Sequence, residues 1–161
     1  VRQRSAQIVD ARTVREFKGE DIRSLRGGHI PGAVNLPYEQ NWQDPQALAK
    51  LQRGQTRDSA GMSLKPVEDL RKLYTGLDPN KETIVYCQSG VRAAETATVL
   101  RDLGFKDVKV YDSSWLGYGN NLALPAENES FFNVGALNGR LARLQARVDE
   151  LEAALEQAKR R

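Results

Sequence analysis

The feature that most constrains the fold is a strand, a short polar turn and a helix that follow one another without a linker. Residues 82–87 (ETIVYC) are mostly β-branched or aromatic, as in a buried strand. Residues 88–90 (QSG) form the polar turn, and residues 91–104 (VRAAETATVLRDLG) have apolar side chains at helical spacing and a glycine at the end. The only cysteine, Cys87, therefore lies where a strand ends and a helix begins.

Strands and helices alternate along the first 125 residues. Further short strands are predicted for QIVDA, residues 33–36 and DVKVY, and helices for RTVREF, DPQALAKLQRG and KPVEDLRKLYTGL. In the second of these helices, Asp44 is the expected N-cap and Gly54 the stop. The segment RGGHIPG is predicted to begin as a turn, and DSSWLGYGNNLALP to be a loop. The alternation predicts an α/β domain with a central parallel sheet and helices on both faces.

The composition changes after Pro125, so residues 1–130 are predicted to form the main domain and residues 131–161 a separate helix. Apolar residues recur there at alternating steps of three and four: Val134, Leu137, Leu141, Leu144, Val148, Leu151 and Leu155. This heptad pattern favours a two-stranded parallel coiled coil and a homodimer through residues 134–158, in which Arg147 at position g meets Glu152 at position e of the partner. The alternative is one amphipathic helix packed on its own domain.

Charge and composition exclude several functions. The 24 basic and 21 acidic residues are well mixed, so no nucleic-acid interface is expected. No apolar run is long enough for a membrane span, and one cysteine with one histidine argues against a disulfide or a zinc site. The sequence begins with Val1, as in a processed form or a fragment of a longer chain, and leaves open a cytoplasmic or a periplasmic location.

The position of Cys87 suits a nucleophile. Ligands of parallel α/β folds bind beyond the carboxyl ends of the strands, and a strand-to-helix turn can direct several N–H groups and the positive end of a helix dipole at one point. Gly90 permits backbone conformations closed to other residues, and Arg92 supplies a forked donor for anions. These features favour a reactive thiolate; the alternative is an inert cysteine at the end of a core strand.

Three sequence blocks resemble the rhodanese (sulfurtransferase) domains. They are IVDARTVREFKG, GGHIPGAVNLP and IVYCQSGVRAAETATVLRDLGFKDVKVYDSSWLGYGN, in this order, and the resemblance covers about residues 5–125. The end of the last block, GFKDVKVYDSSWLGYGN, is further similar to the catalytic half of tandem-domain sulfurtransferases. The resemblance implies a rhodanese-like fold, whose central parallel sheet has five strands. It also implies an enzyme in which Cys87 takes the outer sulfur of a small anionic donor as a persulfide. A thiol or cyanide then accepts that sulfur.

In this scheme Cys87 is the catalytic residue, and its persulfide is held by backbone N–H groups of the loop. The loop residues implied to bind the substrate are Gln88, Ser89, Gly90, Val91 and Arg92. No metal ion or organic cofactor is implied. Two alternatives stay open: a persulfide relay protein that works poorly with thiosulfate, and a catalytically weak module that serves as an interaction or dimerisation domain.

The loop also indicates the substrate class. Cysteine phosphatases related to this fold have five residues between the cysteine and the arginine, whereas four separate Cys87 from Arg92, which leaves less room for a phosphoryl group and favours sulfur transfer. Mercaptopyruvate-using relatives commonly have Cys-Gly-Ser/Thr-Gly-Val-Thr in the loop and an arginine before the aromatic residue of the first block. This chain has Gln88 and Arg92 in the loop, and Glu16 before the aromatic residue. Both differences favour thiosulfate, although the basic pair of animal thiosulfate enzymes is also missing.

Other residues in these blocks are expected to be structural. His29 is expected to hydrogen-bond the backbone of its glycine–proline turn, and Asp10 to form an ion pair or network with Arg12. Three arginines are expected to be solvated surface charges: Arg15, Arg23 and Arg26. Three aromatic residues are candidates for the wall of the site, Trp115 more than Tyr38 and Trp42, and the alternative is that each only caps the core.

Overall fold

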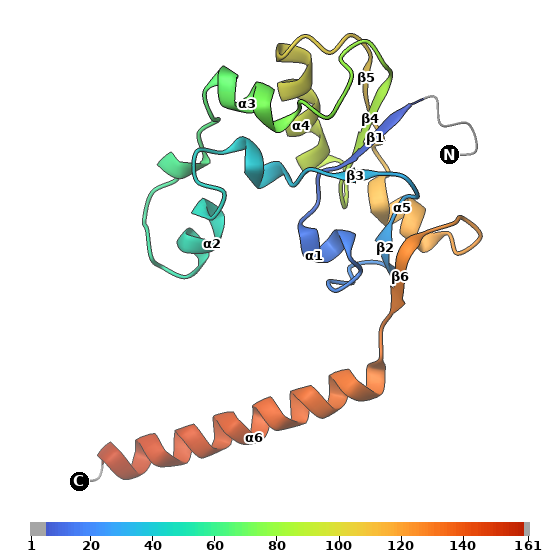
Figure 1. The fold of residues 1–161 in the computed structure, drawn as a ribbon. Coiled ribbons are helices and arrows are strands. Elements are labelled where there is room, and N and C mark those ends of the chain that lie inside the picture. The colour runs from blue at the N-terminus through green and yellow to red at the C-terminus, as the bar shows by residue number, and fades with distance from the viewer. Residues whose placement is uncertain (1–5, 160–161) are drawn as a thin grey trace. The chain divides into compact units, whose positions relative to one another are not determined.

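The computed structural model describes residues 6–159, which contain a four-stranded parallel sheet (Figure 1). The strand order is β3-β1-β4-β5. The strands are β1 (Gln7–Asp10), β3 (Val34–Asn35), β4 (Thr83–Tyr86) and β5 (Val108–Val110). Val9 of β1 is in register with Val34 of β3 on one side and Val85 of β4 on the other. All three pairings are parallel, as the alternation of strands and helices predicts.

The prediction of five strands in this sheet is wrong. The segment Arg26–His29, whose two glycines indicate a turn in the sequence, is strand β2, and it pairs with β6 (Glu127–Phe131) in a separate two-stranded sheet. A Cβ atom at Gly28 would collide with the backbone of β6 at Glu127. Glycine is therefore needed at this position because the two strands approach closely, and sequence alone does not distinguish this from a turn.

Helices cover both faces of the central sheet, as predicted (Figure 1). The helices α3 (Val67–Leu73) and α4 (Val91–Asp102) contribute to one apolar core, and α5 (Ser114–Asn120) to the other. Successive residues of a strand point to opposite faces. Accordingly, Val85 belongs to the core beneath α3 and α4, and the next residue, Tyr86, packs with Trp115 of α5.

Most of the predicted helices are confirmed, with two corrections. The structure contains α1 (Val14–Phe17) and α2 (Ala47–Gln52), and two short 3-10 turns, η1 (Tyr38–Asn41) and η2 (Ala60–Met62). Asp44 is not the N-cap of α2, which begins later, although its carboxylate accepts the Gln46 N–H at 2.9 Å. The loop predicted for residues 112–125 contains α5. Its glycines weaken the helical pattern in the sequence. In the structure, Gly119 lies against the ring of Trp115, and a Cβ atom at this position would collide with that ring.

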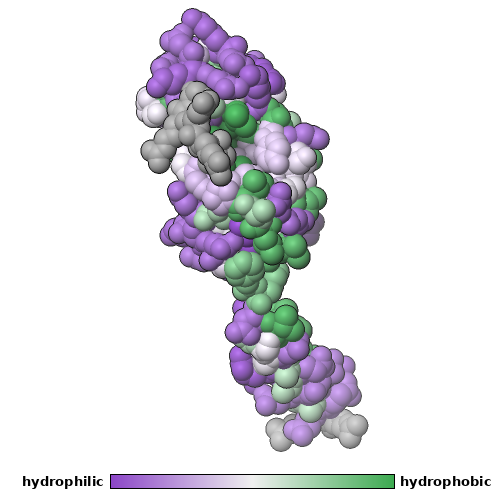
Figure 2. Space-filling view, turned by 90° about the vertical axis from the view of Figure 1, so that its right-hand side faces the viewer, coloured by the Kyte–Doolittle hydropathy of each residue, from purple (hydrophilic) through white to green (hydrophobic). Residues whose placement is uncertain are grey.

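The chain divides into two compact units, one ending at Ser130 and one beginning at Phe131. The second unit contains α6 (Val134–Lys159), a helix of 26 residues, none of which is buried. Hydrophilic residues cover much of its visible surface, with apolar residues between them (Figure 2). No helix among residues 6–159 is long and apolar enough to cross a membrane.

Candidate active site

Cys87 directly follows β4, at the carboxyl end of a central strand of the sheet. Its side chain is fully buried in the apolar core beneath α4. The backbone N–H of Gly90 donates to Cys87 Sγ at 3.2 Å. The turn therefore directs an amide hydrogen at the sulfur, which is an arrangement that stabilises negative charge on a thiol or on a sulfur bound to it.

Gly90 fixes the shape of the turn. It is the N-cap of α4 and has φ +93°, in the region that favours glycine. A Cβ atom here would lie 3.0 Å from Asp112 Oδ1 and 3.1 Å from the Asp112 carbonyl oxygen. Both the backbone conformation and the close approach of the loop after β5 therefore require glycine. The sequence pattern indicates the first of these requirements but not the second.

The first turn of α5 supports the loop from behind. Ser114 Oγ accepts the Cys87 N–H at 3.1 Å and donates to the Tyr111 carbonyl at 2.8 Å. The N–H of Trp115 donates to the Cys87 carbonyl, and the N–H of Leu116 to the Gln88 carbonyl, each at 2.9 Å. Ser114 has φ +48°, so its backbone holds a conformation that non-glycine residues adopt at a cost.

Arg92 lies in the first turn of α4 and forms an ion pair with Glu16 of α1. Arg92 Nη1 is 2.7 Å from Glu16 Oε2, and Nη2 is 2.8 Å from Oε1. Burial raises the pKa of Glu16, but the hydrogen bonds and charge of Arg92, together with the hydrogen bonds of Thr13, outweigh it and lower the pKa from 4.5 to about 2. Burial opposes the charge of Arg92 as well, yet Glu16 raises the pKa of Arg92.

The remaining loop residues differ in exposure. Gln88 is buried, and its Nε2 donates to the Arg23 carbonyl at 2.9 Å and to Ser24 Oγ at 3.1 Å. Its Oε1 is buried without a hydrogen-bond partner among residues 6–159. Ser89 is exposed, and the Val91 side chain is 76% exposed. The loop therefore combines buried residues that fix its shape with two exposed residues at its outer side.

A cavity of about 390 Å³ lies beside Arg92. Its wall includes Glu16 and Tyr38, and the Arg92 guanidinium carbon is 5.5 Å from the centroid of the Tyr38 ring. Its charged lining residues are Glu16, Asp21, Arg23, Glu39 and Arg92. Cations and carboxylates are thus mixed around this cavity. An anion could bind there only if the guanidinium groups of Arg23 and Arg92 point into the cavity.

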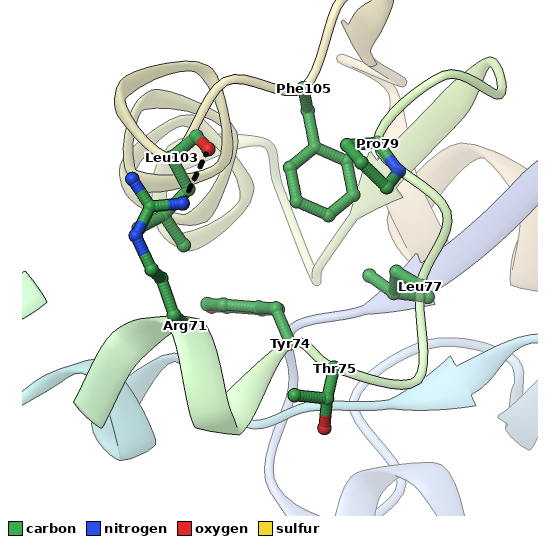
Figure 3. A pocket seen from close by; sticks show the side chains of 7 residues that line it. All are labelled: Arg71, Tyr74, Thr75, Leu77, Pro79, Leu103 and Phe105. Carbon is green, nitrogen blue, oxygen red and sulfur yellow. Dashed lines mark hydrogen bonds between the residues drawn. The ribbon is translucent and has the colours of Figure 1, made fainter. Parts of the chain in front are cut away.

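A second cavity, of about 190 Å³, lies at the other end of α4 (Figure 3). Seven residues line it: Arg71, Tyr74, Thr75, Leu77, Pro79, Leu103 and Phe105. Arg71 donates to the Leu103 carbonyl at 3.3 Å. The cavity lies beyond the carboxyl end of α4, whereas the Cys87 loop precedes its amino end. This cavity is therefore separate from the Cys87 loop.

The expected ion pair of Asp10 and Arg12 is confirmed. Arg12 Nη2 is 2.6 Å from Asp10 Oδ2, and both side chains are buried. Arg12 also donates to the Gly28 carbonyl at 2.7 Å, and Tyr86 Oη donates to Asp10 Oδ2 at 2.6 Å. This network joins β1, β2 and β4 through the Nε and Nη2 groups of Arg12.

His29 also has structural contacts, with different partners from those expected. Its Nδ1 is 2.9 Å from the Phe17 carbonyl oxygen of α1 and its Nε2 is 3.0 Å from Glu127 Oε2. The imidazole stacks on the Phe17 ring with centroids 3.6 Å apart. His29 therefore holds α1 and β6 to β2 and does not brace its own turn.

Two expectations about the surroundings are wrong. Arg26 is 1% exposed and is not a surface charge, because it pairs with Glu129 at 2.7 Å and donates to two backbone carbonyls. Trp115 is 1% exposed and belongs to the core, where its Nε1 donates to the Arg26 carbonyl at 3.1 Å. Of the aromatic candidates, Tyr38 borders the cavity beside Arg92, and Trp42 is buried with its Nε1 donating to Glu95.

Two residues that contact the loop were not predicted to do so. The first is Glu16, for which the sequence contains a local signal only. Thr13 and Glu16 have the spacing of a capping box, and the structure contains this capping box. Nothing in the sequence pairs Glu16 with Arg92, however. Ser114 has no sequence signal as the acceptor for the Cys87 N–H, because the segment around it resembles a loop.

Comparison with known proteins defines the family. The profile of the rhodanese-like domain matches residues 1–121. The chain therefore belongs to the rhodanese-like domain family, as its three sequence blocks indicate.

Curated relatives include sulfurtransferases of two kinds. The chain is 43% identical over 129 residues to the thiosulfate sulfurtransferase of Corynebacterium glutamicum, covering 74% of this chain and 38% of that protein. It is 39% identical over 119 residues to a probable 3-mercaptopyruvate sulfurtransferase of Schizosaccharomyces pombe, covering 70% of this chain and 35% of that protein. The chain thus spans less than half the length of these relatives.

Solved structures have the same fold. The 3-mercaptopyruvate sulfurtransferase from Leishmania major has a TM-score of 0.59 and 25% identity, covering 77% of this chain and 32% of that chain. EanB in its complex with ergothioneine has a TM-score of 0.63 and 20% identity, covering 78% and 29% of the respective chains. The second similarity concerns the fold alone.

Proposed function

We propose that the protein is a sulfurtransferase that moves sulfane sulfur from thiosulfate to a thiophilic acceptor through a persulfide on Cys87. The Cys87 thiolate attacks the outer sulfur of thiosulfate, forming the S–S bond of the persulfide as the bond to sulfite breaks. Cyanide or a thiolate then attacks the outer sulfur, which releases the Cys87 thiolate. The observation that carries the proposal is the Gly90 N–H directed at Cys87 Sγ, at 3.2 Å, in a turn between strand and helix.

In this proposal the residues after Cys87 bind the substrate. Backbone N–H groups of Gln88, Ser89, Gly90, Val91 and Arg92 hold the persulfide anion. Arg92 attracts the anionic donor, and Glu16 fixes its orientation through the bidentate pair. Because Cys87 is fully buried, the donor reaches Sγ only when the surrounding side chains move apart.

The test is direct detection of the adduct. After incubation with thiosulfate, intact-mass measurement is expected to show a gain of one sulfur atom on the protein, with sulfite released in equal amount. Addition of cyanide should remove that sulfur and yield thiocyanate. Cys87→Ser should form no adduct while keeping the wild-type unfolding midpoint, and sulfur transfer that survives in this variant would reject the mechanism.

The donor is settled by comparing kcat/KM for thiosulfate and for 3-mercaptopyruvate. Thiosulfate is expected to be the better donor, because Glu16 occupies the place where mercaptopyruvate-using relatives have an arginine. Curated relatives of this chain are named for either donor. A ratio strongly favouring 3-mercaptopyruvate would reverse this choice without affecting the role of Cys87.

A second candidate function is persulfide relay or interaction by a catalytically weak module. The full burial of Cys87 favours a protein partner that opens the site, and the exposed apolar residues of α6 favour association. Residues 1–130 would then be the rhodanese domain and residues 131–161 the association segment. Slow turnover with thiosulfate combined with fast transfer from a protein persulfide would distinguish this function from the first.

A further inference from the structure

The helix α6 carries an exposed apolar seam along one side. Seven residues at heptad positions a and d are 44–62% exposed: Val134, Leu137, Leu141, Leu144, Val148, Leu151 and Leu155. A helix in water gains most of its stability from burying such a face. Within α6 the polar side chains offer only weak support, such as the pair of Arg147 and Glu150 at 2.9 Å. The glycines Gly135 and Gly139 weaken its first turns further.

The width of the seam suits another helix. Its residues keep to positions a and d, the pattern of a two-helix coiled coil, whereas a helix packed on a globular surface has a wider apolar face. Positions a and d contain no charged residue between Val134 and Ala158. From these observations and the flanking charges, we infer that α6 pairs in parallel and in register with α6 of a second copy of this chain. This inference is independent of the chemistry at Cys87.

The charges beside the seam select the orientation. In a parallel pair, position g of one helix faces position e of the next heptad in the other helix. Arg147 at g then meets the partner's Glu152 at e, once on each side of the pair. The other contacts of this kind join Arg140 to the partner's Gln145 and Ala154 to the partner's Lys159, so no like charges meet.

An antiparallel pair lacks this complementarity. With the seams fully overlapped, Leu144 packs beside the partner's Val148, and position g faces position g. Arg147 then lies near the partner's Arg147 at the centre of the pair, where like charges repel. Glu152 lies near the partner's Asn138 and gains no cation. The parallel arrangement is therefore favoured by the sign of the charges as well as by the register of the seam.

The oligomeric state tests the association. Sedimentation equilibrium of the full chain should give the mass of a dimer. Leu144→Glu at position d should give a monomer with unchanged thermal unfolding of the first unit, whereas Ala146→Glu at the outer position f should remain a dimer. A monomer mass for the wild-type chain at the highest attainable concentration, or a trimer mass, would overturn the inference.

Charge reversal tests the orientation. Arg147→Glu should weaken the dimer about tenfold, because two attractive contacts become repulsive, and adding Glu152→Arg should restore it. Arg143→Glu, at outer position c, is the matched control and should change the dissociation constant less than about twofold. In an antiparallel pair, Arg147→Glu would replace the repulsion between two arginines with a repulsion between two glutamates, and the affinity would hardly change. An unchanged dissociation constant for this variant would therefore overturn the parallel arrangement.

A disulfide provides an independent measurement. In the background Cys87→Ser, Ala158→Cys places one thiol at position d near the carboxyl end of each helix. A parallel pair brings the two thiols together, and mild oxidation should give a covalent dimer on a non-reducing gel. An antiparallel pair separates them by most of the helix, about 36 Å at ~1.5 Å per residue. Failure to cross-link in a sample shown to be dimeric would contradict the parallel register.

Discussion

Arg92 and Glu16 form a two-pronged ion pair, although 76 residues separate them in the sequence. The Glu16 side chain is 1% exposed and that of Arg92 is 16% exposed. The pair joins α1 to the first turn of α4, immediately after the Cys87 loop. Removing one member of a buried pair leaves the other charge without its partner, which costs more free energy than the intact pair contributes.

Glu16→Gln is therefore expected to lower the free energy of unfolding by about 3 kcal/mol at neutral pH. The neutral amide keeps the size of the side chain but leaves Arg92 without its counter-charge. Urea denaturation followed by circular dichroism measures the change. Glu20→Gln is the matched control, because Glu20 and Arg15 form an exposed pair at 3.8 Å, and it should cost less than about 0.5 kcal/mol. Equal losses in both variants would contradict the assigned role of the buried pair.

The same pair predicts a pH dependence of stability. Burial raises the pKa of Glu16, but Arg92, with a smaller contribution from the hydrogen bonds of Thr13, lowers it more, from 4.5 to about 2. A carboxylate whose pKa is lower in the folded state stabilises the protein fully above its unfolded pKa, and this stabilisation is lost as the pH falls through that window. Between about pH 5 and pH 2, the wild type should lose about 3 kcal/mol more than Glu16→Gln. Acid denaturation of both proteins measures the difference, and parallel pH profiles would refute it.

Local patterns predicted the segments that place Cys87. The run of β-branched residues before it, the glycine in the turn and the apolar spacing after it indicate β4, the turn and α4, and all three are in the structure. Gly104 follows the end of α4 with φ +97°, as a helix stop requires. Such features depend on neighbouring residues only, so one sequence is enough to show them.

Contacts between distant segments were not predictable from one sequence. Arg26 resembles the exposed Arg15 in its sequence context, but it is buried because Glu129, 103 residues away, neutralises it. The strand β2 similarly depends on β6. The pairing of Ser114 with Cys87 also depends on the path of the chain after β5. Local spacing contains no information about these partners.

The proposed role of Arg92 in donor binding can be tested separately from its role in folding. In the double variant Glu16→Gln with Arg92→Gln, no buried charge is left unpaired, so the protein should fold. Loss of the charge-assisted hydrogen bonds to the donor should lower kcat/KM for thiosulfate by about 10- to 100-fold. Thiocyanate formation measures this, with Arg15→Gln and Glu20→Gln together as the control pair on the surface. A folded double variant with unchanged kcat/KM would exclude Arg92 from donor binding.

Gly90→Ala tests the shape of the turn. The added Cβ would lie 3.0 Å from Asp112 Oδ1 at a backbone φ of +93°, so the turn must distort. We expect a loss of about 1–3 kcal/mol in stability, and at least about tenfold lower kcat/KM from misplacement of the N–H that faces the sulfur. Gly76→Ala is the control, because no atom of the described part of the chain lies within 4 Å of the new Cβ. Sulfur transfer in Gly90→Ala at the rate of this control would show that the conformation of Gly90 is unimportant.

Ser114→Ala and Ser114→Gly together test the support behind Cys87. Either change removes the Oγ that accepts the Cys87 N–H at 3.1 Å and leaves this buried donor without its partner, at a cost of about 1–3 kcal/mol. Glycine also relieves the strained φ of +48°, so Ser114→Gly should be more stable than Ser114→Ala by about 1 kcal/mol. Both should lower kcat/KM, because the start of the loop is no longer held. Ser113→Ala is the neighbouring control, since Ser113 makes no side-chain hydrogen bond to the start of α5. If Ser114→Ala had the same stability and the same kcat/KM as Ser113→Ala, α5 would not position the cysteine.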